Sequence, residues 1–488
     1  MDRSARMSSL VLVALASGFV IASVDATVVN VAAVAIGRSL QSSVTGITWL
    51  VDSYVLTFAS LLLLGGALAT EHGSRQLYLA GMVVFLAASI GCALAPDELI
   101  LIATRALEGA GAALFMPSSL SLLVGIFTEP AQQARMLGLW SAIVAVSAAI
   151  GPSLGGIMVS AFGWRSIFLI NIPVVAVGIA MTLRVIPPTT GTRRRVSPVG
   201  HALFFVAVAA GAFILIQGRS SGFSAPETLA AGALLVAAAS VLITHQMRTS
   251  DPIMPWTLFT RRCFRGVNTV GLLYSGALYG CLYLMGLYFQ NVRHVSAIEA
   301  GLQMLPMTMC FPLGNLLYTQ IHHRVSNATI MATCLGTAGL ASALLLLVSP
   351  GTPYWHLAVI LGLANSGAGL VTASMTAASV RAAGGENASH AGAVLNTGRQ
   401  VGTLIGIAIV SLILQSFSNG YEGLHLASGL IAVVYLLAGL TAAATARPPK
   451  RCTVRAADVG PVNRSAIVDT AGPGILSCSR SGESSDEQ

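Results

Sequence analysis

Charge is what this sequence has least of. Only 9% of its 488 residues are Asp, Glu, Lys or Arg, whereas soluble domains contain about 25%. By contrast, 55% of the residues are hydrophobic, and the mean hydropathy is +0.78. A chain so poor in charge cannot cover a soluble globule with a hydrated surface, and its apolar runs are too long for core strands. The composition therefore predicts an integral protein of the lipid bilayer.

Several kinds of chemical site are missing as well. No Gly-x-x-x-x-Gly-Lys-Ser/Thr segment occurs, which argues against ATP-driven work by this chain alone. The seven cysteines have no paired spacing, so neither a disulfide framework nor a zinc site is indicated. The net charge of +8 comes from basic residues in short loops without interleaved aromatics, so nucleic-acid binding is not expected. We therefore predict no metal, no cofactor and no enzymatic activity.

Long apolar segments fill most of the chain. Since a membrane-spanning helix needs about 20 apolar residues, the sequence predicts an all-α membrane protein with 14 transmembrane helices. The first segment continues past Asp25 to about residue 36, which is too long for the core of a cleavable signal peptide. The predicted spans are 9–36, 46–69, 76–95, 98–127, 135–160, 166–186, 200–217, 228–246, 266–290, 300–320, 327–348, 354–378, 396–416 and 424–446.

The order of these spans predicts two similar halves. Spans 1–6 (residues 1–186) and spans 9–14 (residues 266–446) form two six-helix bundles in this interpretation, because duplicated halves are common in secondary transporters. The linker 187–265 then contributes two inserted helices. After Ala446 the composition changes to Arg, Ser, Gly and Pro, so residues 447–488 are predicted to be a disordered tail.

The distribution of basic residues predicts the orientation. If the N-terminus is inside, 18 of the 26 basic residues lie in inner segments, and four (Arg38, Arg165, Arg219 and Arg293) lie in outer loops. An excess of Lys and Arg marks the cytoplasmic side. Both termini are therefore predicted to be cytoplasmic. Arginine-dominated basicity with abundant Ala and Gly suggests a GC-rich bacterium and hence its plasma membrane.

Ionisable residues within predicted spans are few: we single out Asp25, Asp52, Arg105 and Glu108, and Arg399 also lies in or at the span 396–416. Such residues are costly in a bilayer and are functional candidates by default. Arg105 and Glu108 are three residues apart and so share a helix face. A carboxylate between an arginine and a low-dielectric cavity can bind and release a proton, so we assign all four to proton coupling. The alternative is that they form ion pairs or hydrogen bonds that hold helices together.

The run Ala145–Gly156, AVSAAIGPSLGG, would weaken an ordinary buried helix, because Pro removes a backbone donor and Gly adds an entropic cost. In a membrane, small residues allow neighbouring helices to approach closely. Gly151, Pro152, Gly155 and Gly156 therefore predict a bent, tightly packed helix. Simple packing is the alternative to a direct role in transport.

Five segments together resemble a known family, the fourteen-span drug:proton antiporters of the major facilitator superfamily. They match strongly over spans 1–6 and loosely over the remainder. The segments are DATVVNVA (25–32), LIATRALEGAGAA (101–113), AAIGPSLGG (148–156), WRSIFLINIPV (164–174) and NTGRQVGTLIGIAI (396–409).

The resemblance implies alternating access between two halves and proton-driven export. It makes Arg105 the proton-linked arginine, Asp25 the first-helix acid, and Gly151–Gly156 the antiporter motif. The loop after span 2 departs from the family's Gly-x-Leu-x-Asp-Arg-x-Gly-Arg-Arg pattern, because Thr70 replaces its aspartate; Glu71 follows and could supply the charge. This inner-gate loop comprises Gly66, Thr70, Glu71, Gly73 and Arg75.

We therefore expect an exporter of hydrophobic or cationic drugs or antibiotics that uses the proton gradient and acts as a monomer. Aromatic and polar positions that suit a cavity for such molecules are Asn30, Tyr279, Tyr283, Asn396 and Arg399. Two alternatives stay open: a dedicated exporter of one endogenous metabolite, and a membrane sensor or enzyme that transports nothing.

Overall fold

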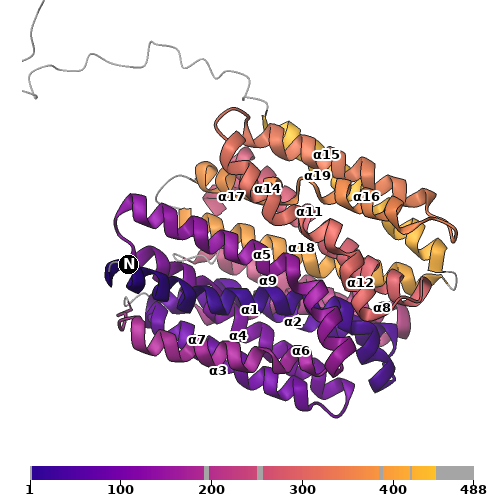
Figure 1. The fold of residues 1–488 in the computed structure, drawn as a ribbon, viewed down its shortest axis with the longest axis horizontal. Helices are drawn as coiled ribbons and strands as arrows, with labels where there is room; N and C mark the ends of the chain where they lie inside the picture. Colours follow the sequence, from indigo (N-terminus) through magenta and orange to yellow (C-terminus); the bar gives the residue numbers. More distant parts are fainter. Residues whose placement is uncertain (1–2, 192–196, 250–255, 384–387, 418–419, 447–488) are drawn as a thin grey trace, which may run out of the picture. The chain divides into compact units, whose positions relative to one another are not determined.

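A computed structural model describes residues 3–191, 197–249, 256–383, 388–417 and 420–446 (Figure 1). Within these ranges the chain consists of helices and short connections, with no strand. The predicted tail 447–488 lies outside the described residues, so its predicted disorder stays a prediction.

The first seven helices pack on one another. Helix α4 lies against both α2 and α3, and α1 lies against α5 and α7. Side chains cap two of these helices: Ser43 accepts a hydrogen bond from the Gly46 amide, and Asp97 accepts one from the Ile100 amide. We call this group the N-terminal half: α1 (Arg3–Leu40), α2 (Val44–His72), α3 (Ser74–Leu94), α4 (Glu98–Ile126), α5 (Pro130–Phe162), α6 (Ser166–Leu169) and α7 (Asn171–Val185).

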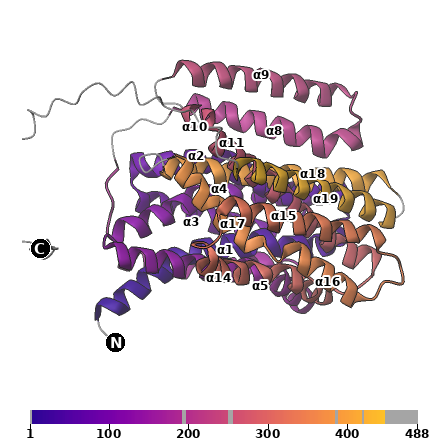
Figure 2. The same ribbon diagram turned by 90° about the horizontal axis from the view of Figure 1, so that it is seen from above.

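Two further helices, α8 (Pro198–Ser221) and α9 (Pro226–Arg248), form a hairpin at the side of the other helices (Figure 2). Helix α8 contacts α2 and α18, whereas α9 lies on the outside of α8. Only 17% of the most apolar stretch of 18 residues in α9 is buried against the rest of the protein. Most of its apolar surface is therefore available to lipid.

The remaining helices follow α10 (Trp256–Thr260). Helix α11 packs against α18 and α19, α15 packs against α19, and α14 packs against α17. We call this group the C-terminal half: α11 (Arg262–Leu287), the π-helical turn η1 (Tyr288–Val292), α12 (Ala297–Gln303), α13 (Leu305–Thr308), α14 (Cys310–Ile321), α15 (Asn327–Ala343), the 3-10 turn η2 (Leu344–Leu347), α16 (Tyr354–Asn365), α17 (Ala368–Ala383), α18 (Ala388–Ser416) and α19 (Gly420–Ala446).

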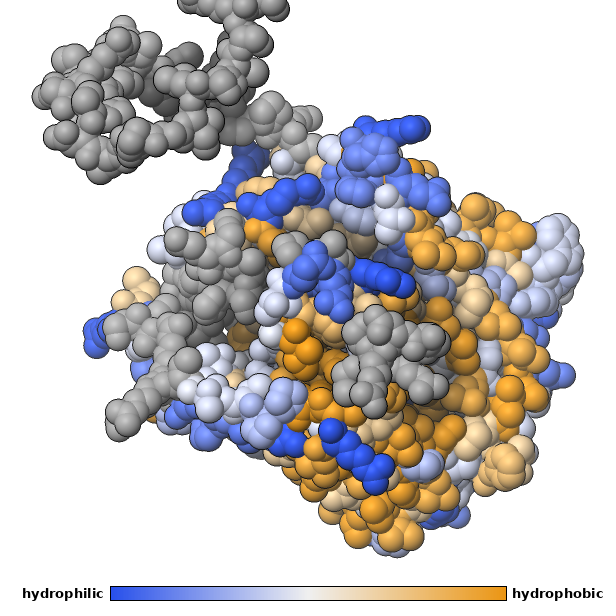
Figure 3. Space-filling model, turned by 60° about the vertical axis from the view of Figure 1, so that its left-hand side comes forward, coloured by the Kyte–Doolittle hydropathy of each residue, from blue (hydrophilic) through white to orange (hydrophobic). Residues whose placement is uncertain are grey.

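Thirteen helical segments among the described residues are long and apolar enough to cross a membrane. Large apolar side chains such as Leu94, Leu347 and Leu440 are exposed on their flanks. Figure 3 shows a broad orange hydrophobic surface with blue hydrophilic side chains gathered toward its edges. This surface suits contact with lipid tails and confirms the multi-pass membrane protein expected from composition.

The tenth predicted span, 300–320, is not one continuous helix. It is divided into α12, α13 and α14, with breaks at Met304 and Met309. Pro306 and Pro312 lack the amide hydrogen that a continuous helix needs, which accounts for these breaks. The count of fourteen continuous spanning helices is therefore not confirmed, although all three short helices pack against α5.

Glycines allow α11 and α18 to touch backbone to backbone. A Cβ atom at Gly402 would overlap the carbonyl oxygen of Leu272, and one at Gly406 would overlap the carbonyl oxygen of Gly276. The residue numbers of the contacting pairs increase in both helices, from Gly402 and Leu272 to Gly406 and Gly276, so the two helices run parallel. At Gly398, on the same helix, a Cβ atom would meet nothing within 4 Å.

We expect Gly406→Ala to destabilise the C-terminal half, because the added methyl group forces the two backbones apart. Overpacking of this kind costs about 1–3 kcal/mol of unfolding free energy. Thermal unfolding of the purified protein, followed by size-exclusion chromatography, should show a lower Tm. The matched control Gly398→Ala should unfold at the wild-type temperature. Equal Tm values for the two variants would contradict the close contact.

Candidate functional site

Three of the four predicted ionisable residues meet in the core of the N-terminal half. The Arg105 Nη1 atom of α4 lies 2.5 Å from Asp25 Oδ2 of α1 and 2.7 Å from Glu108 Oε2 of its own helix. The side chains of all three are 1% exposed or less. The i,i+3 spacing of Arg105 and Glu108 thus produces the shared face that the sequence predicts. We call these three residues the charge cluster.

Two neutral side chains complete the hydrogen bonding of the carboxyl groups. Ser89 Oγ of α3 donates to Glu108 Oε1 at 2.5 Å. Asn171 Nδ2 of α7 lies 3.4 Å from both Asp25 Oδ1 and Glu108 Oε1, and 3.2 Å from the Ser89 hydroxyl. Four helices of the N-terminal half, α1, α3, α4 and α7, therefore meet at the charge cluster.

Aromatic rings cover the guanidinium group. The Arg105 Cζ atom lies 4.5 Å from the ring centre of Tyr54 in α2 and 5.8 Å from that of Phe168 in α6. The negative electrostatic potential on the face of each ring attracts the guanidinium cation. They also separate the cluster from water, so in this conformation it is closed.

The charge cluster has one more acidic group than basic groups. If both carboxyl groups were ionised, one negative charge would be left uncompensated in an apolar interior, which is strongly unfavourable. One proton on either carboxyl group makes the cluster neutral. Its chemistry therefore suits the uptake and release of a single proton when access to water changes.

Asp52 of α2 is separate from this cluster. Its side chain is fully buried, and neither carboxyl oxygen has a hydrogen-bond partner among the described residues. One turn earlier on the same helix face, Thr48 hydrogen-bonds to Ser411 of α18 and, at 3.1 Å, to the Tyr283 hydroxyl of α11. Asp52 thus faces the contact between the two halves.

The glycine-rich part of α5 also packs at this contact. Helix α5 continues through Pro152. A Cβ atom at Gly151 would overlap Thr27 of α1, and one at Gly155 would lie 3.0 Å from the Val28 carbonyl oxygen. These glycines therefore let α1 and α5 approach closely, as the sequence predicts.

An adjacent face of α5 touches the C-terminal half. A Cβ atom at Gly156 would overlap the carbonyl oxygen of Ala297 in α12, and Gly301 packs in the same way against Pro152. The Ser153 hydroxyl donates to the Gly301 carbonyl oxygen at 3.0 Å. The motif thus lies between α1 and a helix of the other half.

The predicted cavity residues divide between two places. Asn30 and Tyr283 are 2% and 1% exposed and lie in the contact between the halves. Tyr279 of α11 and Arg399 of α18 are only half-buried, and Arg399 Nε donates to Ser275 Oγ at 3.4 Å. Asn396 is half-buried one turn before Arg399 on the same helix face. The structure therefore does not bring all five residues together.

The inner-gate loop joins α2 to α3 within the N-terminal half. Gly73 has a φ of +97°, which favours glycine, and it lets α3 begin immediately after α2. Beyond it, the Arg75 amide donates to Thr189 Oγ1 at 2.9 Å, and Arg75 Nη2 donates to the Leu183 carbonyl oxygen at 3.2 Å. The Thr70 hydroxyl bonds within its own helix, to the Gly66 carbonyl oxygen at 3.2 Å.

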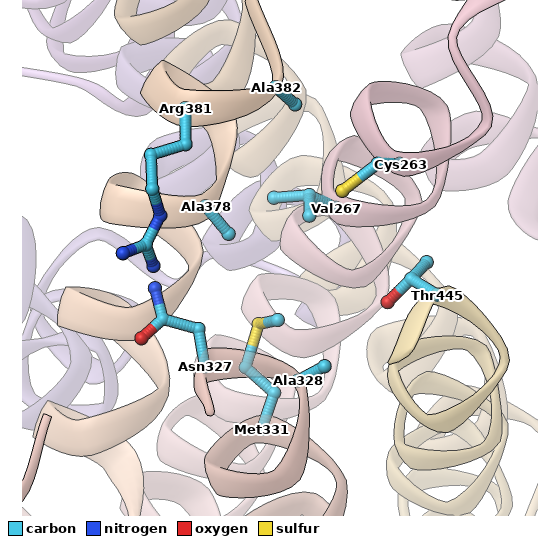
Figure 4. A pocket seen from close by; sticks show the side chains of 9 residues that line it. All are labelled: Cys263, Val267, Asn327, Ala328, Met331, Ala378, Arg381, Ala382 and Thr445. Carbon is cyan, nitrogen blue, oxygen red and sulfur yellow. The ribbon is translucent and has the colours of Figure 1, made fainter. Parts of the chain in front are cut away.

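A cavity of about 290 Å³ lies among α11, α15, α17 and α19, and Figure 4 shows its lining. No predicted site residue lines it. No group of three His, Cys, Asp or Glu side chains in the described part of the chain could hold a metal ion. The cavity is lined by Cys263, Val267, Asn327, Ala328, Met331, Ala378, Arg381, Ala382 and Thr445.

The neutral residues around the charge cluster were not predicted from the sequence. Asn171 is a single polar residue in the apolar run FLINIPV, and this isolation was a usable signal. Ser89 and Tyr54 had no comparable signal, because serine and tyrosine occur throughout the spans. Only the packing of α2 and α3 against α4 shows their role.

We expect Arg105→Met to destabilise the protein by about 3–5 kcal/mol, because it leaves two buried carboxyl groups without a cation. The triple variant Arg105→Met, Asp25→Asn, Glu108→Gln should regain most of that stability, since it removes all three charges. Tm and membrane abundance measure both effects. A triple variant no more stable than the single one would contradict the charge balance described above.

Comparison with known proteins places this architecture in a family. The sequence profile described as Major Facilitator Superfamily matches residues 15–407. The chain is 50% identical to a methylenomycin A resistance protein of Streptomyces coelicolor, over 92% of this chain and 95% of the relative. It is 39% identical to a methylenomycin A resistance protein of Bacillus subtilis, over 88% of this chain and 92% of the relative.

A solved structure supports the same fold. The crystal structure of a POT family transporter in complex with 5-aminolevulinic acid aligns with a TM-score of 0.68 at 15% identity. The alignment covers 90% of this chain and 96% of that chain. From its helical architecture and the sequence match over most of its length, this chain belongs to the Major Facilitator Superfamily.

Proposed function

We propose that this protein is a proton-coupled exporter that gives its host resistance to methylenomycin A or a chemically similar antibiotic. The named cargo is supported by 50% identity along nearly the whole of a methylenomycin A resistance protein. The proton coupling is supported by the charge cluster of Asp25, Arg105 and Glu108, which one proton makes neutral. That cluster is the observation that supports the mechanism most directly.

Alternating access is supported by the way the halves touch. Besides the α5 contacts, Gln290 Nε2 of η1 donates to the Val31 carbonyl oxygen at 2.9 Å, and Gln415 of α18 accepts from Thr45 at 3.2 Å. All these contacts lie in the part of the helices nearer the turn between α1 and α2. In the proposed orientation, with both termini cytoplasmic, that part faces outward. This conformation is then closed to the outside.

Transport follows from switching between two such states. When these contacts separate, α1 and α5 move relative to the C-terminal half. Water then reaches the charge cluster from the outer side of the membrane. A proton taken up outside and released inside restores the starting state while the cargo moves out. We place the protein as a monomer in a bacterial plasma membrane, because one chain contains both halves.

A multidrug exporter is the second candidate. It is favoured by the half-buried aromatic side chain of Tyr279, since aromatic walls accept apolar molecules of different shapes. A panel of unrelated antibiotics separates the two candidates. Resistance confined to methylenomycin A supports the dedicated exporter, whereas a broad profile supports the multidrug one.

Expression in a susceptible, pump-deficient bacterium should raise the minimal inhibitory concentration of methylenomycin A. A protonophore should abolish active efflux of the antibiotic from the same cells, because it removes the proton gradient. Cells with an empty vector provide the control. Efflux that continues in the presence of the protonophore would contradict proton coupling, and unchanged susceptibility would contradict the assigned cargo.

Asp25→Asn should abolish uphill efflux, because the variant keeps the Arg105–Glu108 pair but can no longer exchange a proton at Asp25. Membrane abundance and downhill cargo exchange in proteoliposomes should stay at wild-type levels. Asp97→Asn is the matched control: Asp97 is exposed, and asparagine caps a helix as well as aspartate does. Wild-type uphill efflux by Asp25→Asn would remove Asp25 from the mechanism.

A further inference from the structure

Arg399 of α18 is embedded in a membrane-spanning helix and, among the described residues, has no counter-ion comparable to those of Arg105. We propose that it binds the carboxylate of the cargo, so that the exported molecule is an organic acid with an apolar body. This inference deepens the proposed function, on which it rests, and narrows the hydrophobic or cationic cargo expected from the sequence to an apolar molecule that carries a carboxylate.

Arg399 lies far from both ends of its helix. It follows Ala388 by 11 residues and precedes Ser416 by 17, which places it roughly 16 Å and 25 Å from the two ends at 1.5 Å per residue. A charge within a membrane-spanning helix is costly and is seldom kept without a role in binding or coupling. Helix packing alone gives no reason for a cation at this position.

The side chain does not extend toward the nearer end of the helix. Gly402 of α18 is level with Leu272 of α11, so the Arg399 backbone is level with a residue before Leu272. Nevertheless, Arg399 Nε bonds to Ser275, which lies beyond Leu272 along the same helix. The guanidinium group therefore points toward the middle of the helix pair. Arginines that only escape the bilayer extend the other way, toward water.

The protein does not neutralise this cation. The ion pairs in the described part of the chain both belong to Arg105, and Arg399 has no carboxylate within 4.0 Å there. Its bonded partner, Ser275, is a neutral hydroxyl. Arg105, by contrast, is 1% exposed and touches two carboxyl groups. The half-buried Arg399 is thus both accessible and uncompensated.

The neighbours of Arg399 suit an acid with an apolar body. Tyr279 is half-buried on α11, one turn beyond Ser275 on the same helix face, and Ser275 is the residue to which Arg399 bonds. Its ring offers an apolar wall beside the cation. The amide of Asn396, one turn before Arg399, adds a hydrogen-bond donor on the same helix face.

Carboxylate recognition follows from the geometry of the group. A guanidinium presents parallel N–H donors that match the two oxygens of a carboxylate, whereas a neutral amide forms weaker bonds and a quaternary cation is repelled. Lysine keeps the charge but not the paired donors. Comparing arginine with lysine at position 399 therefore distinguishes recognition of a carboxylate by paired donors from simple attraction to a positive charge.

The test measures binding to the purified full-length protein in nanodiscs by calorimetry. The probes share one apolar body: naphthalene-1-acetate, naphthalene-1-acetamide and (naphthalen-1-ylmethyl)trimethylammonium. Wild type should bind the acid about tenfold more tightly than the amide and the cation, as one charged hydrogen-bonded pair predicts. Absence of acid binding, or equal affinity for acid and amide, overturns the proposal.

Arg399→Gln should lose the preference for the acid and keep the affinity for the amide, while Arg399→Lys keeps part of the preference. Arg265→Gln, which removes an exposed arginine of α11, should bind all three probes as wild type does. An acid preference that survives in Arg399→Gln overturns the proposal. If that variant does not fold, Arg399→Lys and the wild-type comparison of acid with amide still decide it.

The two proposals fail in different ways. Loss of methylenomycin A resistance or of protonophore sensitivity would contradict the proposed exporter, whatever the probes bind. Proton-driven export combined with a preference for the cation or the amide would contradict only the role of Arg399.

Discussion

The interior of this protein is organised by the cost of a charge in a medium without water. Arg105 is acceptable at the centre of the N-terminal half because Asp25 and Glu108 contact it and because Tyr54 and Phe168 cover it. Ser89 and Asn171 then satisfy the remaining carboxyl oxygens. The relative positions of α1, α3, α4 and α7 depend on this one arrangement. Its charge balance also requires a proton, so the interaction that stabilises the bundle is the one that suits it to coupling.

A second constraint is close contact between helices that must also separate. Gly156 and Gly301 place α5 of the N-terminal half directly against α12 of the C-terminal half. Such contacts rely on shape and contain few charged or strongly bonded groups, so they can form and break at low cost. The bonds across the halves, among them Ser153 to Gly301 and Thr48 to Tyr283, are single neutral hydrogen bonds. The firm interactions therefore lie within a half and the weak ones between halves.

Much of this was predictable, because a bilayer imposes simple rules on sequence. Long runs of apolar residues predicted the thirteen helical segments that can span a membrane. Because charges are rare within those runs, Asp25, Arg105 and Glu108 could be singled out from the sequence. The tenth predicted span, 300–320, is not one continuous helix, since hydropathy takes no account of the amide hydrogens that Pro306 and Pro312 lack. Asp52 and Arg399 could be recognised as unusual, but whether each had a partner could not, because partners come from helices distant in the chain.

By itself, the sequence determined the class of protein and its helical segments, because burial in lipid requires apolar length and penalises every charge. It also determined that Arg105 and Glu108 share a face, since three residues make almost one helical turn. Only the tertiary structure decided which arginine is neutralised. Arg105 meets Asp25 across 80 residues of chain, whereas the hydrogen-bond partner of the Arg399 side chain among the described residues is the hydroxyl of Ser275. Pairing energies depend on distance in space, which helix packing sets and which no local pattern of residues records.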